Sequence, residues 1–415
     1  MHMLLKETLR QVAAEQKAEL LACEYGVERE ELAGIKPNLP FAAVISGVRR
    51  CGKSTLLRQL AGRLGRFSYF NFEDTRVTGF EPSDFGRLDE VFQEAKGGGG
   101  HYLFDEIQNV PGWEQFARQG LDRKRKFTIT GSNASLLSRE LGTKLTGRHL
   151  NHELFPFSYA EMLAFTKRQK PGPKSFLEYL ERGGFPAFLK YGRPEILREL
   201  LADIIQRDIA ARYRIRSLRT LKDMALYLLS NVGKEFSYNS LKKAFSLGSV
   251  NTAISFVSYF EDSYLLFTMP MFDYSPKKQL AGPKKVYSID NGLSTANSVS
   301  FSADKGRLLE NLVFLSLRRK SKDIFYFKGS EGECDFLVKE EGKIALAVQA
   351  CYELNEGNLQ RETAGLAEAV AKFGLKKGLI LTLAQEDEIT QNGVKIAIKP
   401  AWKWLLGKKQ TTQPD

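Results

Sequence analysis

Short apolar runs that end in small or acidic residues dominate the first third of the chain. The clearest runs are "FAAVI" (41–45), "YFNF" (69–72), "HYLF" (101–104) and "KFTIT" (126–130). Runs of this length, rich in β-branched and aromatic residues, are typical of strands buried in a parallel sheet. Leu and Val recur at helical spacing among charges over residues 1–22, which predicts an amphipathic surface helix. The pattern therefore predicts an α/β domain at residues 35–157, preceded by an N-terminal helical segment at residues 1–34.

Helical periodicity replaces this pattern from residue 158 onward. The segments "SYAEMLAF", "SFLEYLERGGF" and "EILRELLADIIQRDIAARY" alternate apolar and charged residues at helical spacing, with interruptions at Gly183–Gly184 and Pro186. They predict a helical lid at residues 158–215.

A second helical group follows the lid. A helix at about 218–231 leads to a second one, "YNSLKKAF", with Ser237 as its N-cap, and a short turn leads to a third, "VNTAISFVSYFEDS". A hairpin is expected over residues 264–290. Two helices, a turn, a third helix and a hairpin form the order of a winged helix, which we place at residues 216–295.

The C-terminal segment, residues 300–410, predicts a separate α/β unit. A helix (306–319) carries Glu310, and "DIFYFK", "ECDFLVKE" and "KIALAVQACYEL" predict three successive strands in which a hairpin brings Asp335 near Gln349. This order resembles the PD-(D/E)xK core of restriction endonucleases. The lysine motif of that core is replaced here by Gln349-Ala350-Cys351. An amide is a weaker Mg²⁺ ligand than a carboxylate and cysteine supplies no fixed positive charge, so we expect a nuclease-like fold with weak or no cleavage.

A glycine-rich loop follows the first apolar run. Residues 47–54 read G-x(4)-G-K-S, the pattern of a loop whose backbone N–H groups surround phosphate oxygens. Lys53 is expected to bind the β and γ phosphates, and the Ser54 hydroxyl to coordinate Mg²⁺. A helix beginning at "STLL" adds its N-terminal dipole. The predicted nucleotide-binding residues are Gly47, Val48, Arg49, Arg50, Cys51, Gly52, Lys53, Ser54 and Thr55.

An acidic pair ends the run at residues 101–106. Asp105 is expected to hold Mg²⁺ with Ser54, and Glu106 is expected to polarise the attacking water as the general base of an ATPase. Glu73 and Asp74 end another run and are given at most a supporting role. The chain shows no N-K-x-D motif, which argues against a GTPase. Ser132 or Asn133, after the run at 126–130, is the candidate sensor of the γ phosphate.

The composition is that of a soluble globular protein, with 43% hydrophobic and 27% charged residues. No apolar run approaches the roughly 18 residues needed to cross a bilayer, so no membrane partner is expected. The four cysteines lack zinc-site spacing, which favours a reducing cytoplasm. The formal net charge of +12 favours a polyanionic partner, and one basic cluster covers residues 206–222.

Several blocks of the chain together resemble one family of prokaryotic AAA-type ATPases, AAA subgroup 14, which carries a C-terminal domain of unknown function. They are "ISGVRRCGKSTLL", "YFNFED", "YLFDEIQNVPGWEQ", "TGSNASLLSRELGTKLTGRHLNHELFPFSYAEML" and "YLERGGFPAFL". The resemblance implies an AAA-like core, ATP with Mg²⁺ and a cytoplasmic location. By that resemblance Ser132 or Asn133 falls at sensor 1. Arg148 falls at the family's "TGR" arginine, the candidate cation for transition-state charge.

Three functions remain open at this point. The first is a DNA-associated ATP-driven motor or switch, in which the winged helix reads DNA with Ser249, Asn251, Thr252 and Ser255. Its phosphate contacts would come from Lys242 and Lys243 and from the wing lysines 277, 278, 284 and 285. The second is an ATP-controlled switch that grips a partner protein or another copy of the chain as a homo-oligomer. The third is an active ATP-regulated nuclease built on Glu310, Asp335 and Gln349.

Overall fold

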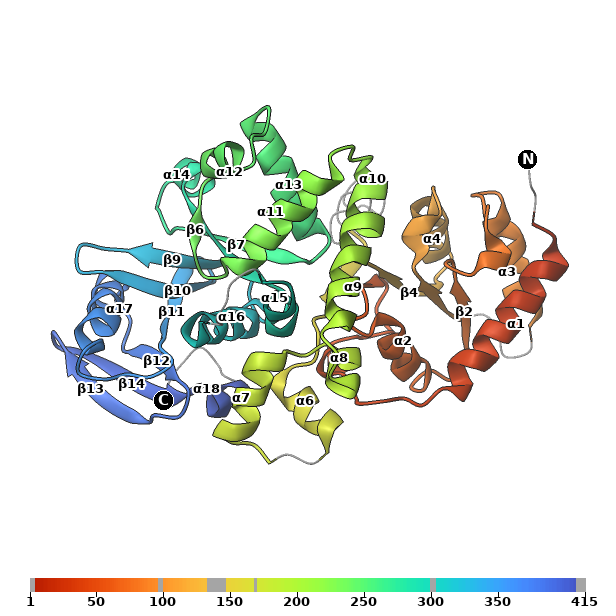
Figure 1. The fold of residues 1–415 in the computed structure, drawn as a ribbon. Coiled ribbons are helices and arrows are strands. Elements are labelled where there is room, and N and C mark those ends of the chain that lie inside the picture. Colours follow the sequence, from red (N-terminus) through yellow and green to blue (C-terminus); the bar gives the residue numbers. More distant parts are fainter. Residues whose placement is uncertain (1–3, 96–99, 133–146, 168–169, 299–303, 408–415) are drawn as a thin grey trace. The chain divides into compact units, whose positions relative to one another are not determined.

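The computed structural model describes residues 4–95, 100–132, 147–167, 170–298 and 304–407 (Figure 1). The chain divides into two compact units. The first comprises Met1–Phe155 with Asp262–Tyr264, and the second comprises Pro156–Glu261 with Leu265–Asp415. Within the described ranges no helix is both long enough and apolar enough to cross a bilayer.

The first unit is built on a parallel sheet whose five described strands lie in the order β2-β3-β4-β1-β5. The strands are β1 (Ala42–Ser46), β2 (Phe67–Asn71), β3 (His101–Asp105), β4 (Lys126–Gly131) and β5 (His149–Glu153). All of their pairings are parallel, so their carboxyl ends share one edge of the sheet. Strands β1 to β4 form where the apolar runs predict them, and β4 rather than β3 is the neighbour of β1.

Helices cover this sheet and bury its apolar residues. They are α1 (Lys6–Ala22), α2 (Lys53–Ala61), α3 (Asp84–Glu94) and α4 (Trp113–Asp122), with 3₁₀ turns at Glu30–Ala33, Thr75–Val77 and Ile107–Asn109. Helix α1, drawn red in Figure 1, lies against β2 and α3. Its Leu9 and Val12 belong to the same core as Phe70. The N-terminal helix is therefore part of the first unit, because its apolar stripe is buried against the sheet.

Helices dominate the first part of the second unit. They are α6 (Tyr159–Thr166), α7 (Pro173–Arg182), α8 (Pro186–Tyr191), α9 (Glu195–Asp203), α10 (Ala211–Tyr213) and α11 (Leu218–Ser230). Gly183 follows the end of α7 and Pro186 begins α8, as the sequence predicts. A π-helical stretch, Ile204–Ala210, connects α9 to α10, which is rare and was not predicted. Helices α7 and α9 pack on α15 (Asn291–Asn297), and α7 also packs on α16 (Lys305–Arg318).

A small antiparallel sheet and the three expected helices lie in the predicted winged-helix segment, together with a short helix that was not expected. The strands β6 (Glu235–Phe236), β7 (Leu266–Pro270) and β8 (Lys284–Ser288) lie in the order β6-β8-β7. The helices are α11, α12 (Tyr238–Ala244) and α13 (Val250–Asp262). Ser237 caps α12 through a capping box with Ser240. The expected hairpin forms from β7 and β8, but its connection contains a short helix, α14 (Pro276–Ala281), which the sequence analysis missed.

The C-terminal part of the second unit is a mixed sheet with the order β13-β14-β12-β11-β10-β9. Its strands are β9 (Ile324–Lys328), β10 (Glu333–Glu340), β11 (Lys343–Ala350), β12 (Gly378–Thr382), β13 (Asp387–Gln391) and β14 (Val394–Pro400), with helices α17 (Leu359–Phe373) and α18 (Ala401–Leu406). Strands β9, β10 and β11 pair antiparallel in succession, as predicted. Phe336 pairs with Val348, and this register brings Asp335 beside Gln349.

Candidate functional site

The loop between β1 and α2 depends on two glycines. A Cβ at Gly47 would lie 2.2 Å from the carbonyl oxygen of Leu154, so no side chain fits there. Gly52 has a φ of 105° immediately before α2, a conformation that glycine adopts at no steric cost. Val48 and Cys51 are fully buried. The side chains of Val48 and Cys51 therefore point into the core, and the backbone at the two glycines carries no side chain that could block a ligand. The first turn of α2 follows and contains Lys53, Ser54 and Thr55.

Lys53 lies at the centre of the predicted site. Its side chain is 5% exposed, and its Nζ lies 3.4 Å from Glu106 Oε1. The same ammonium donates to the carbonyl oxygens of Gly47, at 3.2 Å, and Val48, at 3.4 Å. The ammonium is thus held over the loop by weak contacts with carbonyl groups and one carboxylate.

Asp105 ends β3 and is 1% exposed. Its carboxylate accepts hydrogen bonds from the hydroxyl groups of Thr130 and Ser54 and, at 3.2 Å, from that of Tyr69. Burial and the charge of Glu106 raise the pKa of Asp105 above its usual range, against the opposing effects of these hydroxyls and Lys53. The predicted partner Ser54 does reach Asp105, although β4 lies between β1 and β3.

Glu106 follows Asp105 in a left-handed conformation, with a φ of 54°. Its backbone N–H donates to Thr130 Oγ1 at 3.0 Å, and Gln108 Nε2 donates to its Oε2 at 2.5 Å. Burial opposes the charge of Glu106, but Lys53, Gln108 and Arg49 outweigh it and lower the pKa of Glu106. The group is therefore an ionised carboxylate held in place by its neighbours.

The acids after β2 have different surroundings. Glu73 pairs with Arg49 at 3.7 Å, and its pKa is raised by burial and by the charge of Glu106. Asp74 instead caps a 3₁₀ turn by accepting from the Arg76 N–H, and it also accepts from Gln16 at 3.0 Å. Of these two acids, Glu73 is therefore the one whose pKa is affected by the charged residues around Lys53.

The remaining predicted residues of this unit differ in position. Ser132 is buried directly after β4, at the sheet edge that carries Asp105, and Asn133 lies outside the described residues. Arg148 is exposed and pairs with Asp122. Its carbonyl oxygen accepts from the N–H of Ala42 at the start of β1, so Arg148 lies at the amino edge of the sheet. The structure therefore does not bring Arg148 to Lys53 in the same chain, because a five-residue strand, roughly 16 Å long, separates the two edges.

Arg29 is a site residue that the sequence analysis missed. It is 2% exposed, and its guanidinium donates to the carbonyl oxygens of Cys51 and Phe155, both at 2.7 Å. Its backbone N–H donates to Gln59 Oε1 at 3.0 Å. Arg29 thus joins the glycine-rich loop to α2 and to the residues after β5. Nothing in the local pattern around Arg29 signals this role.

In the second unit, the predicted nuclease-like residues gather around an unpredicted lysine. Glu310 on α16 and Asp335 on β10 contact the Lys285 ammonium at 3.0 and 3.2 Å. Gln349 Oε1 accepts from the Asp335 N–H at 3.1 Å. Lys285 was expected to contact DNA from the wing. That expectation is wrong, because its side chain is 5% exposed and paired with carboxylates.

The predicted DNA-contacting residues lie on α12, on α13 and in the turn between them. Asn251 and Lys243 are exposed, and Lys242, Thr252 and Ser255 are half-buried. Ser249 is exposed, and its Oγ accepts from the Thr252 N–H at 3.1 Å, which caps α13. Their placement is compatible with contact by a large ligand.

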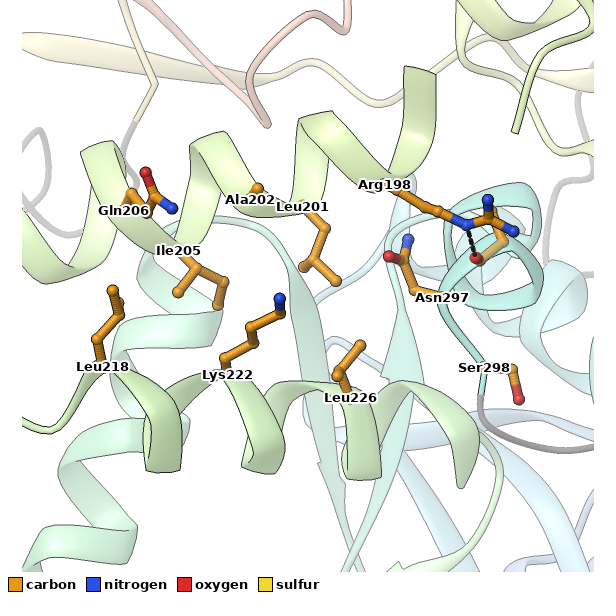
Figure 2. Close-up of a pocket in the computed structure, with 11 residues that line it drawn as sticks. Arg198, Leu201, Ala202, Ile205, Gln206, Leu218, Lys222, Leu226, Asn297 and Ser298 are labelled. Carbon is orange, nitrogen blue, oxygen red and sulfur yellow. Dashed lines mark hydrogen bonds between the residues drawn. The ribbon is translucent and has the colours of Figure 1, made fainter. Parts of the chain in front are cut away.

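A separate hollow of about 370 Å³ lies in the second unit, between the α9–π-helical segment and α11 (Figure 2). Aliphatic side chains line it from both sides, Leu201 and Ile205 from the α9–π-helical segment and Leu226 from α11, together with two basic side chains, Arg198 and Lys222. Arg198 Nε donates to the carbonyl oxygen of Ala296 at 3.1 Å. None of the predicted site residues lines this hollow.

The chemistry of the first site fits a magnesium nucleotide. Lys53 and Arg49 supply positive charge, and the loop has no side chain at Gly47 or Gly52 to obstruct phosphate oxygens. Ser54 and Asp105 are a hydroxyl and a carboxylate already in contact, and oxygen ligands of these kinds suit Mg²⁺. The residues present can therefore hold both groups.

A parallel sheet with a glycine-rich loop after β1 and an acidic pair at the carboxyl end of β3 defines the class of P-loop nucleotide-binding proteins. Within that class, residues 40–163 match the AAA_14 family model, described as an AAA domain. Residues 173–303 match a second model, described as a domain of unknown function (DUF8612).

Two relatives cover most of the chain. An uncharacterized protein of Methanocaldococcus jannaschii, MJ1544, is 35% identical over 395 residues, which are 88% of each chain. An uncharacterized protein of Haemophilus influenzae is 29% identical over 381 residues, 87% of this chain and 94% of that one. The chain belongs to this AAA-domain family.

Solved structures give a weaker comparison. Cdc6p from Pyrobaculum aerophilum matches with a TM-score of 0.27 and 12% identity, over 72% of this chain and 94% of that one. PCH-2 from C. elegans matches with a TM-score of 0.25 and 13% identity, over 47% of this chain and 61% of that one. At such scores neither likeness supports an argument about this chain.

Proposed function

We propose that the chain binds ATP with Mg²⁺ at the loop of residues 47–54 and hydrolyses it. The observation that carries the proposal is the meeting of Lys53, Ser54, Asp105 and Glu106 at the carboxyl edge of one sheet. A buried ammonium, a hydroxyl–carboxylate pair and a second carboxylate are the groups that phosphoryl transfer to water requires.

Each residue has a distinct task in this proposal. Lys53 binds phosphate oxygens, Ser54 and Asp105 hold the metal ion, and Glu106 takes the proton from the attacking water. Bound Mg²⁺ supplies charge stabilisation at the transferring phosphoryl group. In the structure the ammonium of Lys53 is shared with Glu106. When Lys53 turns to phosphate, Glu106 loses its main cation, so its pKa rises and it becomes a stronger base.

We further propose that the segment at residues 216–295 is a winged helix that contacts DNA. The order of α11, α12, α13, β7 and β8 supports this assignment, as does the formal charge of +12. Asn251 and Ser255 on α13 are then the residues that reach base edges. Lys242 and Lys243 at the end of α12 contact phosphates.

The C-terminal sheet supports a nuclease-like fold without cleavage. The helix α16 and the strands β9 to β11 follow the expected order, but Gln349 stands where a carboxylate is needed and donates to Glu362 at 2.9 Å. We propose that this part of the chain binds a partner or responds to the nucleotide state of the first unit, and does not cleave nucleic acid.

The test is a pair of variants in the first site. Lys53→Ala should abolish binding of a fluorescent ATP analogue, because the buried cation is lost. Glu106→Gln should keep Mg-dependent binding and lower the rate of phosphate release by about 10²- to 10⁴-fold, the usual contribution of a general base. Lys36→Ala and Glu19→Gln, at exposed positions of the same unit, are the controls and should match the parent.

Two results would contradict the proposal. Hydrolysis at the parental rate in Glu106→Gln would remove Glu106 as the base. Absence of Mg-linked ATP binding in the parent chain would remove the nucleotide site itself.

A further inference from the structure

The second unit contains an ammonium group enclosed by three carboxylates. Lys285 Nζ on β8 lies 2.6 Å from Glu333 and 3.2 Å from Asp335, both on β10, and 3.0 Å from Glu310 on α16. The side chains of Lys285 and Asp335 are 5% and 9% exposed. Carboxylates from two elements, β10 and α16, thus converge on one buried cation of a third, β8. We call them the Lys285 cluster.

The carboxylates of this cluster are fixed by further hydrogen bonds. Asp335 Oδ2 accepts from the Ala350 N–H at 3.0 Å, which leaves Oδ1 directed at Lys285. Tyr287 donates its O–H to Glu310 Oε1 at 2.7 Å. The carboxylates of Asp335 and Glu310 are therefore also held by a backbone N–H and a phenol O–H, independently of the lysine.

The charges of the cluster do not balance. The Lys285 ammonium faces three carboxyl groups, and Lys328 makes a longer contact with one of them, Glu333, at 3.7 Å. The carboxyl groups therefore outnumber the ammonium groups in contact with them.

We propose that the Lys285 cluster is a divalent-cation site in which the Lys285 ammonium takes the place of the metal ion. The ammonium shows that this arrangement already holds a cation, and its ligands are carboxylate oxygens, the donors that Mg²⁺, Mn²⁺ and Ca²⁺ prefer. In the described ranges no three or more His, Cys, Asp or Glu side chains stand ready for a metal.

The cation in this site is a lysine side chain of the protein, which has two consequences. The lysine excludes metal from the C-terminal sheet, so metal-dependent cleavage is absent for a reason separate from Gln349. It also ties β8 to α16 and β10 through ion pairs. The inference concerns residues outside the ATP site and does not rest on the proposed ATPase function.

The test replaces the lysine and measures Mn²⁺ binding to the full chain by isothermal titration, without nucleotide. Lys285→Met removes the charge and keeps an apolar stem of similar length. We expect this variant to bind one Mn²⁺ more than the parent, and the parent to show no Asp335-dependent binding. Mn²⁺ should also raise its melting temperature. In Lys285→Met/Asp335→Asn the additional binding should disappear.

Lys284→Met is the matched control, because Lys284 precedes Lys285 on β8, is half-buried and lies outside the Lys285 cluster. It should gain no Mn²⁺. A folded Lys285→Met that binds no more Mn²⁺ than the parent would overturn the proposal. Asp335-dependent Mn²⁺ binding in the parent would overturn it equally, since the ammonium would then not exclude metal.

A second variant covers poor folding of Lys285→Met, which removes the ammonium shared by the three carboxylates. Lys285→Met/Glu310→Gln removes one of these charges and keeps Glu333 and Asp335 as ligands. Binding of Mn²⁺ to this variant, lost on adding Asp335→Asn, supports the proposal. Absence of binding in the folded double variant refutes it.

Discussion

Arg29 holds the glycine-rich loop by a hydrogen bond from its guanidinium to the carbonyl oxygen of Cys51, and this contact does not require a ligand. A buried guanidinium that donates to two carbonyl groups is strongly localised. Its two partners are the carbonyl oxygen of Cys51 in the loop and that of Phe155, which follows β5. The conformation of the loop therefore depends on a residue that lies outside the matched AAA domain of residues 40–163.

We expect Arg29→Met to raise the Kd for ATP by about tenfold and to lower the stability of the first unit by about 1–3 kcal/mol. Two buried carbonyl groups lose their donors, and each unpaired group has a cost of that order. Nucleotide titration and thermal denaturation measure the two effects. The control is Arg63→Met, because Arg63 is 47% exposed and pairs with Glu28 on the surface. An unchanged Kd in Arg29→Met would show that the loop holds its shape without this arginine.

Residues of the site differ in how far the sequence could predict them. Lys53 and Ser54 are fixed by a local pattern, because the loop and the helix that follow one strand need those residue types in that order. Thr130 and Tyr69, which bond to Asp105, come from other strands, and only the strand order brings them together. Lys285 was misassigned for the same reason, since its acidic neighbours are remote in the sequence.

At the scale of elements, Asp290 joins two helical segments of the second unit. It is the N-cap of α15, where its Oδ1 accepts from the Leu293 N–H at 2.9 Å. Its Oδ2 accepts from the Gly184 N–H, between α7 and α8, at 2.6 Å. Burial raises the pKa of Asp290 to about 6 despite these backbone donors. One carboxylate therefore satisfies two helix-end groups that are distant in the sequence.

We expect Asp290→Ala to destabilise the second unit by about 2–4 kcal/mol, because a helix cap and a buried N–H both lose their acceptor. Asp290→Asn should cost less, since its amide oxygen can still cap α15. Urea denaturation followed by circular dichroism gives the order of the three proteins. Asp304→Ala is the matched control, because Asp304 caps α16 from an exposed position and should cost about 1 kcal/mol. Equal losses at the two caps would refute the argument from burial.

Elements were predicted best where one physical signal dominated. Strands β1, β3 and β4 are short apolar runs bounded by polar residues, and a buried parallel strand needs nothing more. Helix α14 was missed because "SPKKQLAG" has no apolar face to mark it, and its described residues are not buried. The π-helical stretch also escaped prediction, because a widened helical turn leaves the residue types unchanged.

For the whole molecule, the net charge of +12 bears on the proposed contact with DNA. Binding that neutralises phosphates releases counterions, so the affinity should fall steeply with salt. Because Lys285 is paired with carboxylates, the phosphate contacts of this segment must come from the other predicted lysines, which are Lys242 and Lys243 on α12 and Lys277, Lys278 and Lys284.

We expect duplex DNA to bind with an affinity that falls linearly on a logarithmic salt scale. In Lys242→Ala/Lys243→Ala the slope should decrease by about 2, since each lost phosphate contact contributes about 0.9. Fluorescence anisotropy at four or more salt concentrations measures it. Lys376→Ala/Lys377→Ala removes the same charge from another adjacent pair and should leave the slope near that of the parent. Equal slopes in both variants would favour a protein partner, the second hypothesis.

The Lys285 cluster also bears on where the polypeptide can be divided. The family match to the domain of unknown function ends at residue 303, whereas Lys285 relies on acids at 310, 333 and 335. A fragment that stops at the family boundary would carry Lys285 without its acidic partners, and the complementary fragment would carry three acids without that cation. Expressed separately, both pieces should aggregate or unfold, so this family boundary does not delimit an independently folding module.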